Sequence, residues 1–239
     1  MVLTTRRPPL PAGIVYYAAL HPAQVVSLSS DAATLATAWA TVSQVNAVNA
    51  YHPVNGLCMA WPPATRVAGT ARAAPVLDAF EEALRATMNE NFYPDLGGGG
   101  IEQFGATEAV NSALLQSQEG FIRLFSMWPP AENATFTSLR ARGAFLVSAS
   151  FAGGATAAPV AVLADASSAG AALVRNCSVL DPWAAAGAPP PWRPLVVHDS
   201  GGASVAVAAD PSWAQQLPVW LFEARSGEQY SVWPPAAAE

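Results

Sequence analysis

Residues 138–151 read SLRARGAFLVSASF, and this stretch decides the fold of the second half of the chain. Its apolar residues recur at every second position: Phe145, Val147, Ala149 and Phe151. Successive side chains of a β-strand point to opposite faces of its sheet, so this spacing predicts a strand with one buried face. The period of two begins at Phe136 and separates this half of the chain from the helical spacing upstream.

Further strands and turns follow this segment. Val160–Leu163 and Leu173–Val179 are short apolar runs typical of strands. Two turn sequences, DSGG at 199–202 and RSGE at 225–228, stand between apolar runs and predict β-hairpins. The four flanking runs are Leu195–Val197, Val205–Val207, Val219–Ala224 and Gln229–Trp233. We therefore expect a β unit after residue 133.

The residues before 134 predict helices. Asp31 is a helix-capping residue, and the apolar residues after it share one helical face: Leu35, Ala38, Trp39, Val42 and Val45. Pro75 suits the first turn of another helix, whose apolar face runs from Val76 to Met88. Helices followed by strands predict an α+β chain of two packed units, with the boundary near residue 133.

Two other segments of this half carry local signals. Leu57–Trp61 opens a helix that Pro62-Pro63 is expected to interrupt. Thr107 is a candidate N-cap for a helix that stops near Gly120. Residues 121–128, FIRLFSMW, then predict a strand or an extended segment.

The composition excludes several classes of protein. Of the 239 residues, 52% are hydrophobic and only 12% are charged, so the chain is not intrinsically disordered. A net charge of −6 without a basic stripe argues against nucleic acid as a partner, because phosphate contacts need clustered Lys or Arg. Cys58 and Cys177 are too few for a disulfide scaffold. No membrane span is expected, because Asp165 interrupts the longest run of small apolar residues.

Glu102 is the most distinctive carboxylate of the chain. It follows the four glycines 97–100 and precedes a helix, where it is either a general base or a charge that favours the helix N-terminus. The glycine run lacks the pattern of nucleotide-binding loops, so no cofactor is expected. No paired-cysteine or HExxH spacing is present, so no metal site is expected. Glu108 is expected in the first turn of its helix, compensating the helix dipole.

Eight tryptophans suit either a hydrophobic core or a sugar-binding cleft, because each indole has a large apolar face and one N–H donor. Most are expected in the core, and the sequence leaves both roles open for Trp61. Asn133 and Asn176 begin N-glycosylation sequons, which matter only in a secreted protein. The localisation is therefore open, with a secreted or extracytoplasmic protein as one alternative.

The centre of the chain resembles glycoside hydrolase family 95, which includes α-L-fucosidases and some α-L-galactosidases. The resemblance rests on Asn91-Phe92-Tyr93-Pro94-Asp95, the glycine run, and residues 101–130, IEQFGATEAVNSALLQSQEGFIRLFSMWPP. It continues through residues 138–151, which are similar to the start of the family's C-terminal β domain. The resemblance implies part of an (α/α)6 barrel of paired helices over residues 1–133 and an antiparallel β-sandwich over residues 134–239.

The resemblance also implies inverting hydrolysis of a terminal glycosidic bond, in which an acid protonates the leaving group and a base activates water. Glu102 is the nearest counterpart of the family's base-side Asp, in a segment one residue shorter than Ile-Asp-Gly-Asn-Phe-Gly. Candidates for sugar contacts are His52, Asn55, Trp61 and Gln103. The family's general acid lies upstream of the matched residues, so the resemblance implies an incomplete enzyme in which that acid is absent from this chain.

Two other hypotheses remain beside the hydrolase. The chain is alternatively a non-catalytic carbohydrate-binding or structural remnant of such an enzyme, or an unrelated α+β protein. A carbohydrate is the expected partner under the first two hypotheses. Helix faces that the rest of a barrel would cover are expected to be exposed here and to favour self-association.

Overall fold

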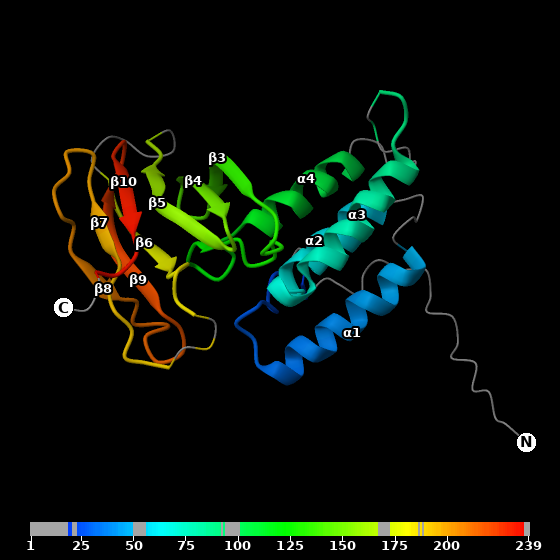
Figure 1. Ribbon diagram of the computed structural model, residues 1–239, viewed down its shortest axis with the longest axis horizontal. Helices are drawn as coiled ribbons and strands as arrows, with labels where there is room; N and C mark the ends of the chain where they lie inside the picture. Colours follow the sequence, from blue (N-terminus) through cyan, green and yellow to red (C-terminus); the bar gives the residue numbers. More distant parts are fainter. Residues whose placement is uncertain are drawn as a thin grey trace, which may run out of the picture. The chain divides into compact units, whose positions relative to one another are not determined.

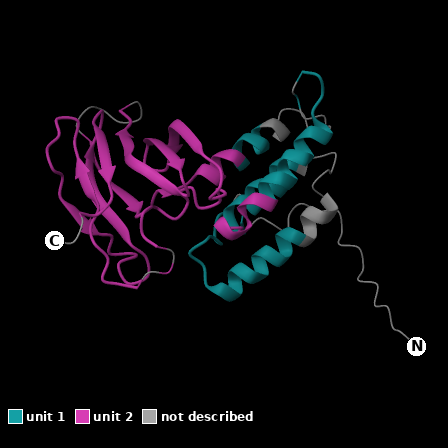
Figure 2. Ribbon diagram, in the orientation of Figure 1, with its two compact units in different colours: residues 1–67, 76–109 teal, residues 68–75, 110–239 magenta. Residues whose placement is uncertain are grey.

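The computed structural model describes residues 19–20, 23–49, 56–91, 93, 101–166, 173–185, 187 and 189–236. Within helices, the side chains of residues 44–49, 56 and 101–103 are outside this description. The chain forms two compact units, one of residues 1–67 and 76–109 and one of residues 68–75 and 110–239 (Figure 2). Helices and antiparallel sheets make this an α+β protein, as expected. The described residues do not form a barrel of helices.

The first unit is built from helices (Figure 1). They are α1 (Ala32–Asn49), α2 (Gly56–Val67), most of α3 (Ala73–Thr87) and the first part of α4 (Ile101–Leu114). The predicted cap of α1 is confirmed, because the Thr34 backbone N–H donates to Asp31 Oδ1 over 2.9 Å and the Thr34 hydroxyl donates to Oδ2 over 2.6 Å. The pKa of Asp31 is lowered by these hydrogen bonds.

The amphipathic character of α3 is also confirmed. Val76, Phe80 and Ala83 are buried on one face, while Glu81 and Arg85 are exposed and form an ion pair on the other. Pro75 lies in the first turn of α3, preceded by a short 3-10 helix over Thr70–Arg72. Proline is tolerated there because the first backbone N–H groups of a helix have no intrahelical acceptor.

Two predicted helix boundaries are wrong. Pro62-Pro63 does not interrupt α2, which continues through both prolines to Val67. Every residue from Ala60 to Ala68 is buried, so packing offsets the cost of prolines in a helix interior, about 3 kcal/mol each. The last helix begins at Ile101 and ends at Leu114, whereas a start at Thr107 and an end near Gly120 were expected.

The second unit contains a five-stranded sheet in the order β3-β4-β5-β10-β7 and a three-stranded sheet in the order β6-β9-β8. Their strands are β3 (Ala134–Ala141), β4 (Phe145–Ala152), β5 (Ala155–Ala164), β6 (Val174–Leu180), β7 (Val196–His198), β8 (Val207–Ala209), β9 (Val219–Arg225) and β10 (Gln229–Trp233). All of these pairings are antiparallel. The predicted alternation of β4 is confirmed, with Phe145, Val147, Ala149 and Phe151 buried.

A third, two-stranded sheet pairs β1 (Leu115–Gln116) with β2 (Arg123–Leu124). Residues 121–128 were expected to form a strand or an extended segment, and only Arg123–Leu124 belongs to a named strand. Ile122 forms an isolated parallel bridge to Val179, so this segment also touches the edge of β6.

The two predicted turns exist, but only the first brings its two flanking segments together as a hairpin. At 199–202 the Asp199 side chain accepts hydrogen bonds from the backbone N–H groups of Gly201 and Ala203. The flanking β7 pairs with β10, whereas β8 pairs with β9. At 225–228 the chain likewise passes from β9 in the smaller sheet to β10 in the larger one. The predicted hairpin around 199–202 is confirmed next to its turn, where the Val205 N–H donates to the Val197 carbonyl over 2.9 Å and His198 forms an antiparallel bridge with Ser204. The hairpin predicted around 225–228 is wrong, because a turn sequence reports local conformation and does not report the sheet that each strand joins.

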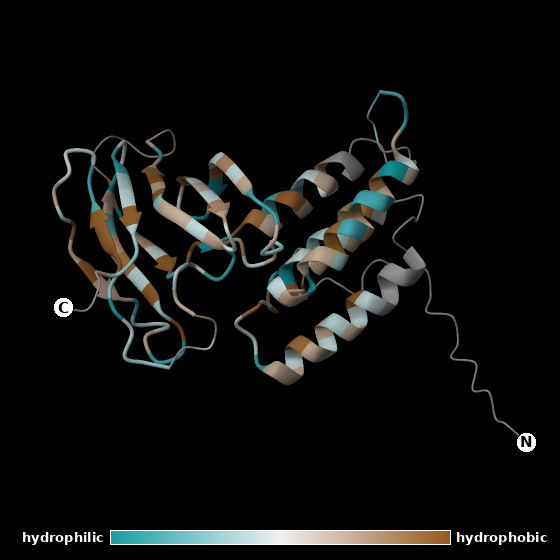
Figure 3. Ribbon diagram, in the orientation of Figure 1, coloured by the Kyte–Doolittle hydropathy of each residue, from teal (hydrophilic) through white to brown (hydrophobic). Residues whose placement is uncertain are grey.

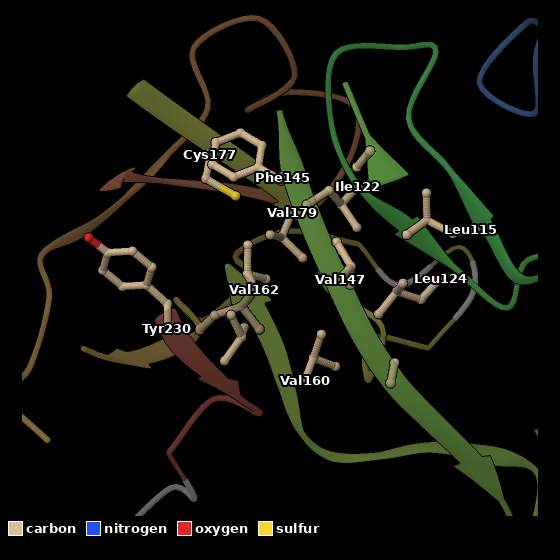
Figure 4. Close-up of a cluster of buried hydrophobic side chains, with 14 of the residues drawn as sticks. Leu115, Ile122, Leu124, Phe145, Val147, Val160, Val162, Cys177, Val179 and Tyr230 are labelled. Atoms are coloured by element: carbon tan, nitrogen blue, oxygen red, sulfur yellow. The ribbon is translucent and has the colours of Figure 1, made fainter. Parts of the chain in front are cut away.

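The faces of both large sheets contribute to one hydrophobic cluster (Figure 4). Val147, Val160 and Val162 come from the five-stranded sheet, whereas Cys177 and Val179 come from β6. Hydrophobic and more polar positions follow one another along the strands, as expected for sheets with one buried face (Figure 3). This arrangement is compatible with the predicted β-sandwich. The expected boundary near residue 133 differs from the grouping of residues 110–133 with the strands.

Candidate functional site

The residues predicted for the site fall partly outside the described structure. His52 and Asn55 lie outside the described residues. Glu102 and Gln103 occupy the first turn of α4, but their side chains are not described. Trp61 is therefore the one predicted site residue whose side chain can be placed. The predicted catalytic and sugar-binding roles of all five stay predictions.

Trp61 is a core residue of the helical unit. Its side chain is 4% exposed, and its ring centroid lies 5.4 Å from that of Phe80 on α3. The indole Nε1 is buried and makes no hydrogen bond with the described part of the chain. A buried N–H donor without an acceptor costs free energy, so the indole N–H of Trp61 is available to donate to a bound group or a water molecule.

The helix that carries Glu102 is held against α2 at two places. Gly105 of α4 lies so close to Cys58 of α2 that a Cβ at Gly105 would lie 2.0 Å from the Cys58 Cα. Farther along, Arg66 of α2 donates from Nη2 to Glu108 Oε1 over 2.5 Å. These contacts fix the position of α4 within its unit, and thereby the backbone position of Glu102.

Glu108 does not lie in the first turn of its helix, where the sequence analysis placed it. It lies in the middle of α4, because the helix begins at Ile101, and so it cannot compensate the N-terminal dipole from the first turn. It instead pairs with Arg66, which is 5% exposed. The signal that could have revealed this pair is Arg66 itself, a charged residue among the small and apolar residues of α2. Buried arginines need a partner.

A pocket in the β unit was missed by the sequence analysis. It has a volume of about 180 Å³ and is lined by Ser117, Gly120, Phe121, Ile122, Arg142, Gly143, Phe145, Asn176 and Ser178. These residues come from three segments that are distant in sequence: the loop after β1, the β3–β4 turn, and β6. The sequence signals at its residues, such as the glycosylation sequon at Asn176, were read for other roles, and nothing local indicated that the three segments meet.

Two buried carboxylates of the β unit accept hydrogen bonds from neighbouring backbone and side-chain groups. Asp181 is 7% exposed, and its Oδ1 accepts hydrogen bonds from the backbone N–H groups of Trp183 and Ala184. Burial raises the pKa of Asp181, and the two hydrogen bonds act in the opposite direction. Asp210 is 8% exposed and accepts a hydrogen bond from the Ser178 hydroxyl over 2.6 Å. Both carboxylates are therefore bound to neighbouring groups.

The described residues contain no group of three or more His, Cys, Asp or Glu side chains that could hold a metal ion. In the same part of the chain, no helix combines the length and the apolar character needed to cross a membrane. Cys58 and Cys177 are buried and form no disulfide, and burial raises the pKa of the Cys177 thiol. A raised thiol pKa disfavours the reactive thiolate, so Cys177 is not a candidate nucleophile.

Comparison with known proteins adds no family assignment, since no family model and no curated protein matches this chain.

Proposed function

We propose that the chain is part of an inverting glycoside hydrolase of the α-L-fucosidase type, with Glu102 as the base-side carboxylate. The observation that carries this proposal is the position of Glu102 in the first turn of α4, a helix clamped to α2 through Gly105 and the Arg66–Glu108 pair. The resemblance of residues 89–151 to family 95 supplies the reaction class. The order of helices followed by antiparallel sheets is consistent with it.

The clamped helix matters because catalysis depends on placement. A base must lie within hydrogen-bond reach of the water it activates, and a displacement of about 1 Å can cost a hundredfold in rate. The glycine contact of α4 with Cys58 leaves no space for even one methyl group. In an inverting hydrolase the base and acid carboxyl groups stand about 6.5–9.5 Å apart, with the sugar and the water between them. The acid is expected upstream, as the resemblance implies.

The experiment is hydrolysis of aryl α-L-fucosides and α-L-galactosides by the full product of the gene, compared with Glu102→Gln. This variant removes the charge of the proposed base and keeps nearly the same shape. The matched control is Glu90→Gln, which changes an exposed carboxylate after α3. The proposal expects turnover in the wild type and in E90Q and its loss in E102Q, and equal turnover in both variants would contradict it.

Carbohydrate binding without hydrolysis is the second candidate function. The observation that favours it is the pocket of the β unit, which is independent of Glu102 and lies wholly within residues 117–178. Under this hypothesis the chain binds a sugar but cleaves no aryl glycoside.

A further inference from the structure

The pocket of the β unit is named here the Asn176 pocket, after the β6 residue in its lining. It lies along the outer edge of β6, the edge that faces away from β9. Ile122 occupies part of the outer edge of β6, donating from its N–H to the Ser178 carbonyl over 2.8 Å and accepting from the Leu180 N–H over 2.9 Å. In an antiparallel pair, the backbone N–H and C=O groups of every second residue point away from the partner strand. Because the backbone groups of Ser178 and Leu180 point away from β9 toward Ile122, those of Asn176 also point away from β9. They lie beyond the stretch of the edge that Ile122 covers.

Three polar side chains add donors and acceptors to this edge. The Asn176 amide is exposed and makes no hydrogen bond within the described part of the chain. The Ser117 Oγ accepts a hydrogen bond from the Arg142 N–H over 3.0 Å, which leaves its own O–H free to donate. The Ser178 hydroxyl donates to Asp210, which leaves its oxygen lone pairs free to accept. The pocket therefore offers both donors and acceptors.

The opposite wall is apolar. Phe121 and Phe145 are 2% and 3% exposed, and Ile122 also belongs to the lining. Phe145 and Ile122 both belong to the core cluster (Figure 4). Two glycines keep space open: a Cβ at Gly120 would meet nothing within 4 Å, whereas a Cβ at Gly143 would lie 2.8 Å from Phe145 Cε2. A side chain at Gly143 would thus crowd the apolar wall.

The lining is almost uncharged. Among the described residues, the lining includes no carboxylate and one cation, Arg142, which donates from Nη1 to the Gln118 carbonyl over 3.1 Å. A volume of about 180 Å³ is below the roughly 300 Å³ at which pockets for drug-sized ligands begin. The pocket has room for one small ring that carries hydroxyl groups on its rim and an apolar C–H face.

We propose that the Asn176 pocket binds a single neutral sugar ring, making it a saccharide-binding site separate from Glu102. The Asn176 amide and the Ser117 and Ser178 hydroxyls would hold ring hydroxyl groups, and the Phe121–Phe145 wall would cover the C–H face. The choice of sugars as the ligand class rests on the proposed function, whereas the site itself rests on the pocket.

The test is a titration of the full chain with methyl α-L-fucopyranoside, followed through backbone amide chemical shifts. The proposal expects saturable shifts at Gly120, Ile122 and Asn176. Asn176→Ala should weaken binding about tenfold, which corresponds to about 1.4 kcal/mol. The matched control is Asn133→Ala, an exposed asparagine outside the pocket, which should bind within about twofold of the wild type.

Sulfate serves as the competing probe. Shifts of the same amides with sulfate but not with the fucoside would overturn the proposal, as would equal binding by the Asn176→Ala and Asn133→Ala variants. Turnover is measured separately on the full gene product, so the two proposals fail separately. Sugar binding by the chain without turnover by the full gene product contradicts the hydrolase proposal, and turnover by the full gene product without shifts at these amides contradicts the pocket proposal.

Discussion

Arg66 of α2 and Glu108 of α4 form a 2.5 Å ion pair between two helices of the first unit. The arginine side chain is 6% exposed and the glutamate side chain is 39% exposed, so only the arginine of the pair is buried. Arg66 Nη1 also donates to the Leu20 carbonyl over 3.5 Å, and its Nε has no partner in the described part of the chain. Glu108 is therefore the main counter-charge of a buried guanidinium.

Removing this counter-charge should destabilise the helical unit. We expect Glu108→Ala to lower the free energy of unfolding by about 2–3 kcal/mol, less than the roughly 3–5 kcal/mol of a fully buried pair because Glu108 is partly exposed. The measurement is urea unfolding followed by circular dichroism. Glu81→Ala is the control, since the Glu81–Arg85 pair is exposed on both sides and should contribute less than about 1 kcal/mol. Equal losses would show that Arg66 does not depend on Glu108.

Two glycines with nearly the same φ should respond differently to substitution. Gly143 has φ +83° and Gly202 has φ +82°, but only Gly143 has Phe145 in the way of a new Cβ. Alanine in the left-handed region costs about 1–2 kcal/mol at either position. Crowding of a packed ring adds about 1–3 kcal/mol at Gly143 alone. Thermal unfolding of the two alanine variants should therefore show a lower midpoint for Gly143→Ala, and equal midpoints would contradict the packing of Phe145.

The cap of α1 should depend on pH. Because the folded-state pKa of Asp31 lies below 3.8, the charged carboxylate stabilises α1 above that pH, and this stabilisation is lost as the pH falls through the folded-state value. The difference in stability between wild type and Asp31→Ala, measured by urea unfolding, should shrink between pH 6 and pH 3. Asp31→Asn is the control, since asparagine caps without titrating. A difference independent of pH would mean that the carboxylate charge does not contribute.

An exposed phenylalanine on α4 offers a test of the expected self-association. Phe104 is 76% exposed, far more than expected for a large apolar side chain. If this helix face associates with a second copy, Phe104→Ser should shift the protein toward monomer in light scattering over a concentration series. Thr107→Ser, an exposed change on the same helix, is the control. An unchanged distribution in F104S would remove Phe104 from any interface.

Local sequence signals predicted the elements that depend on local forces. The cap at Asp31, the amphipathic face of α3 and the alternation of β4 follow from side-chain periodicity and short-range hydrogen bonds. The start of α4 was missed because its Gly105 is a poor helix former, and only the contact with Cys58 shows why a residue without a side chain is needed there.

The pairing of strands that are distant in sequence could not be predicted from the sequence. The turn at 225–228 was identified, but β9 and β10 separate into different sheets, where Phe222 and Tyr230 still meet with ring centroids 5.3 Å apart. The choice of sheet depends on which faces bury each other, not on the turn. For the same reason the Asn176 pocket, assembled from three distant segments, had no local signature. The role of Glu102 was predicted from its position beside the glycine run and from the resemblance to family 95, and it stays a prediction.

The most direct test of the proposed hydrolase is the stereochemistry of its product. Proton NMR of the full gene product with an aryl α-L-fucoside reports which anomer of the sugar forms first. An inverting mechanism with Glu102 as the base predicts that β-L-fucose appears before the anomers equilibrate, and that Glu102→Gln abolishes the signal while Glu90→Gln leaves it intact. Initial release of α-L-fucose, or the same product rate from wild type and Glu102→Gln, would contradict the proposed mechanism.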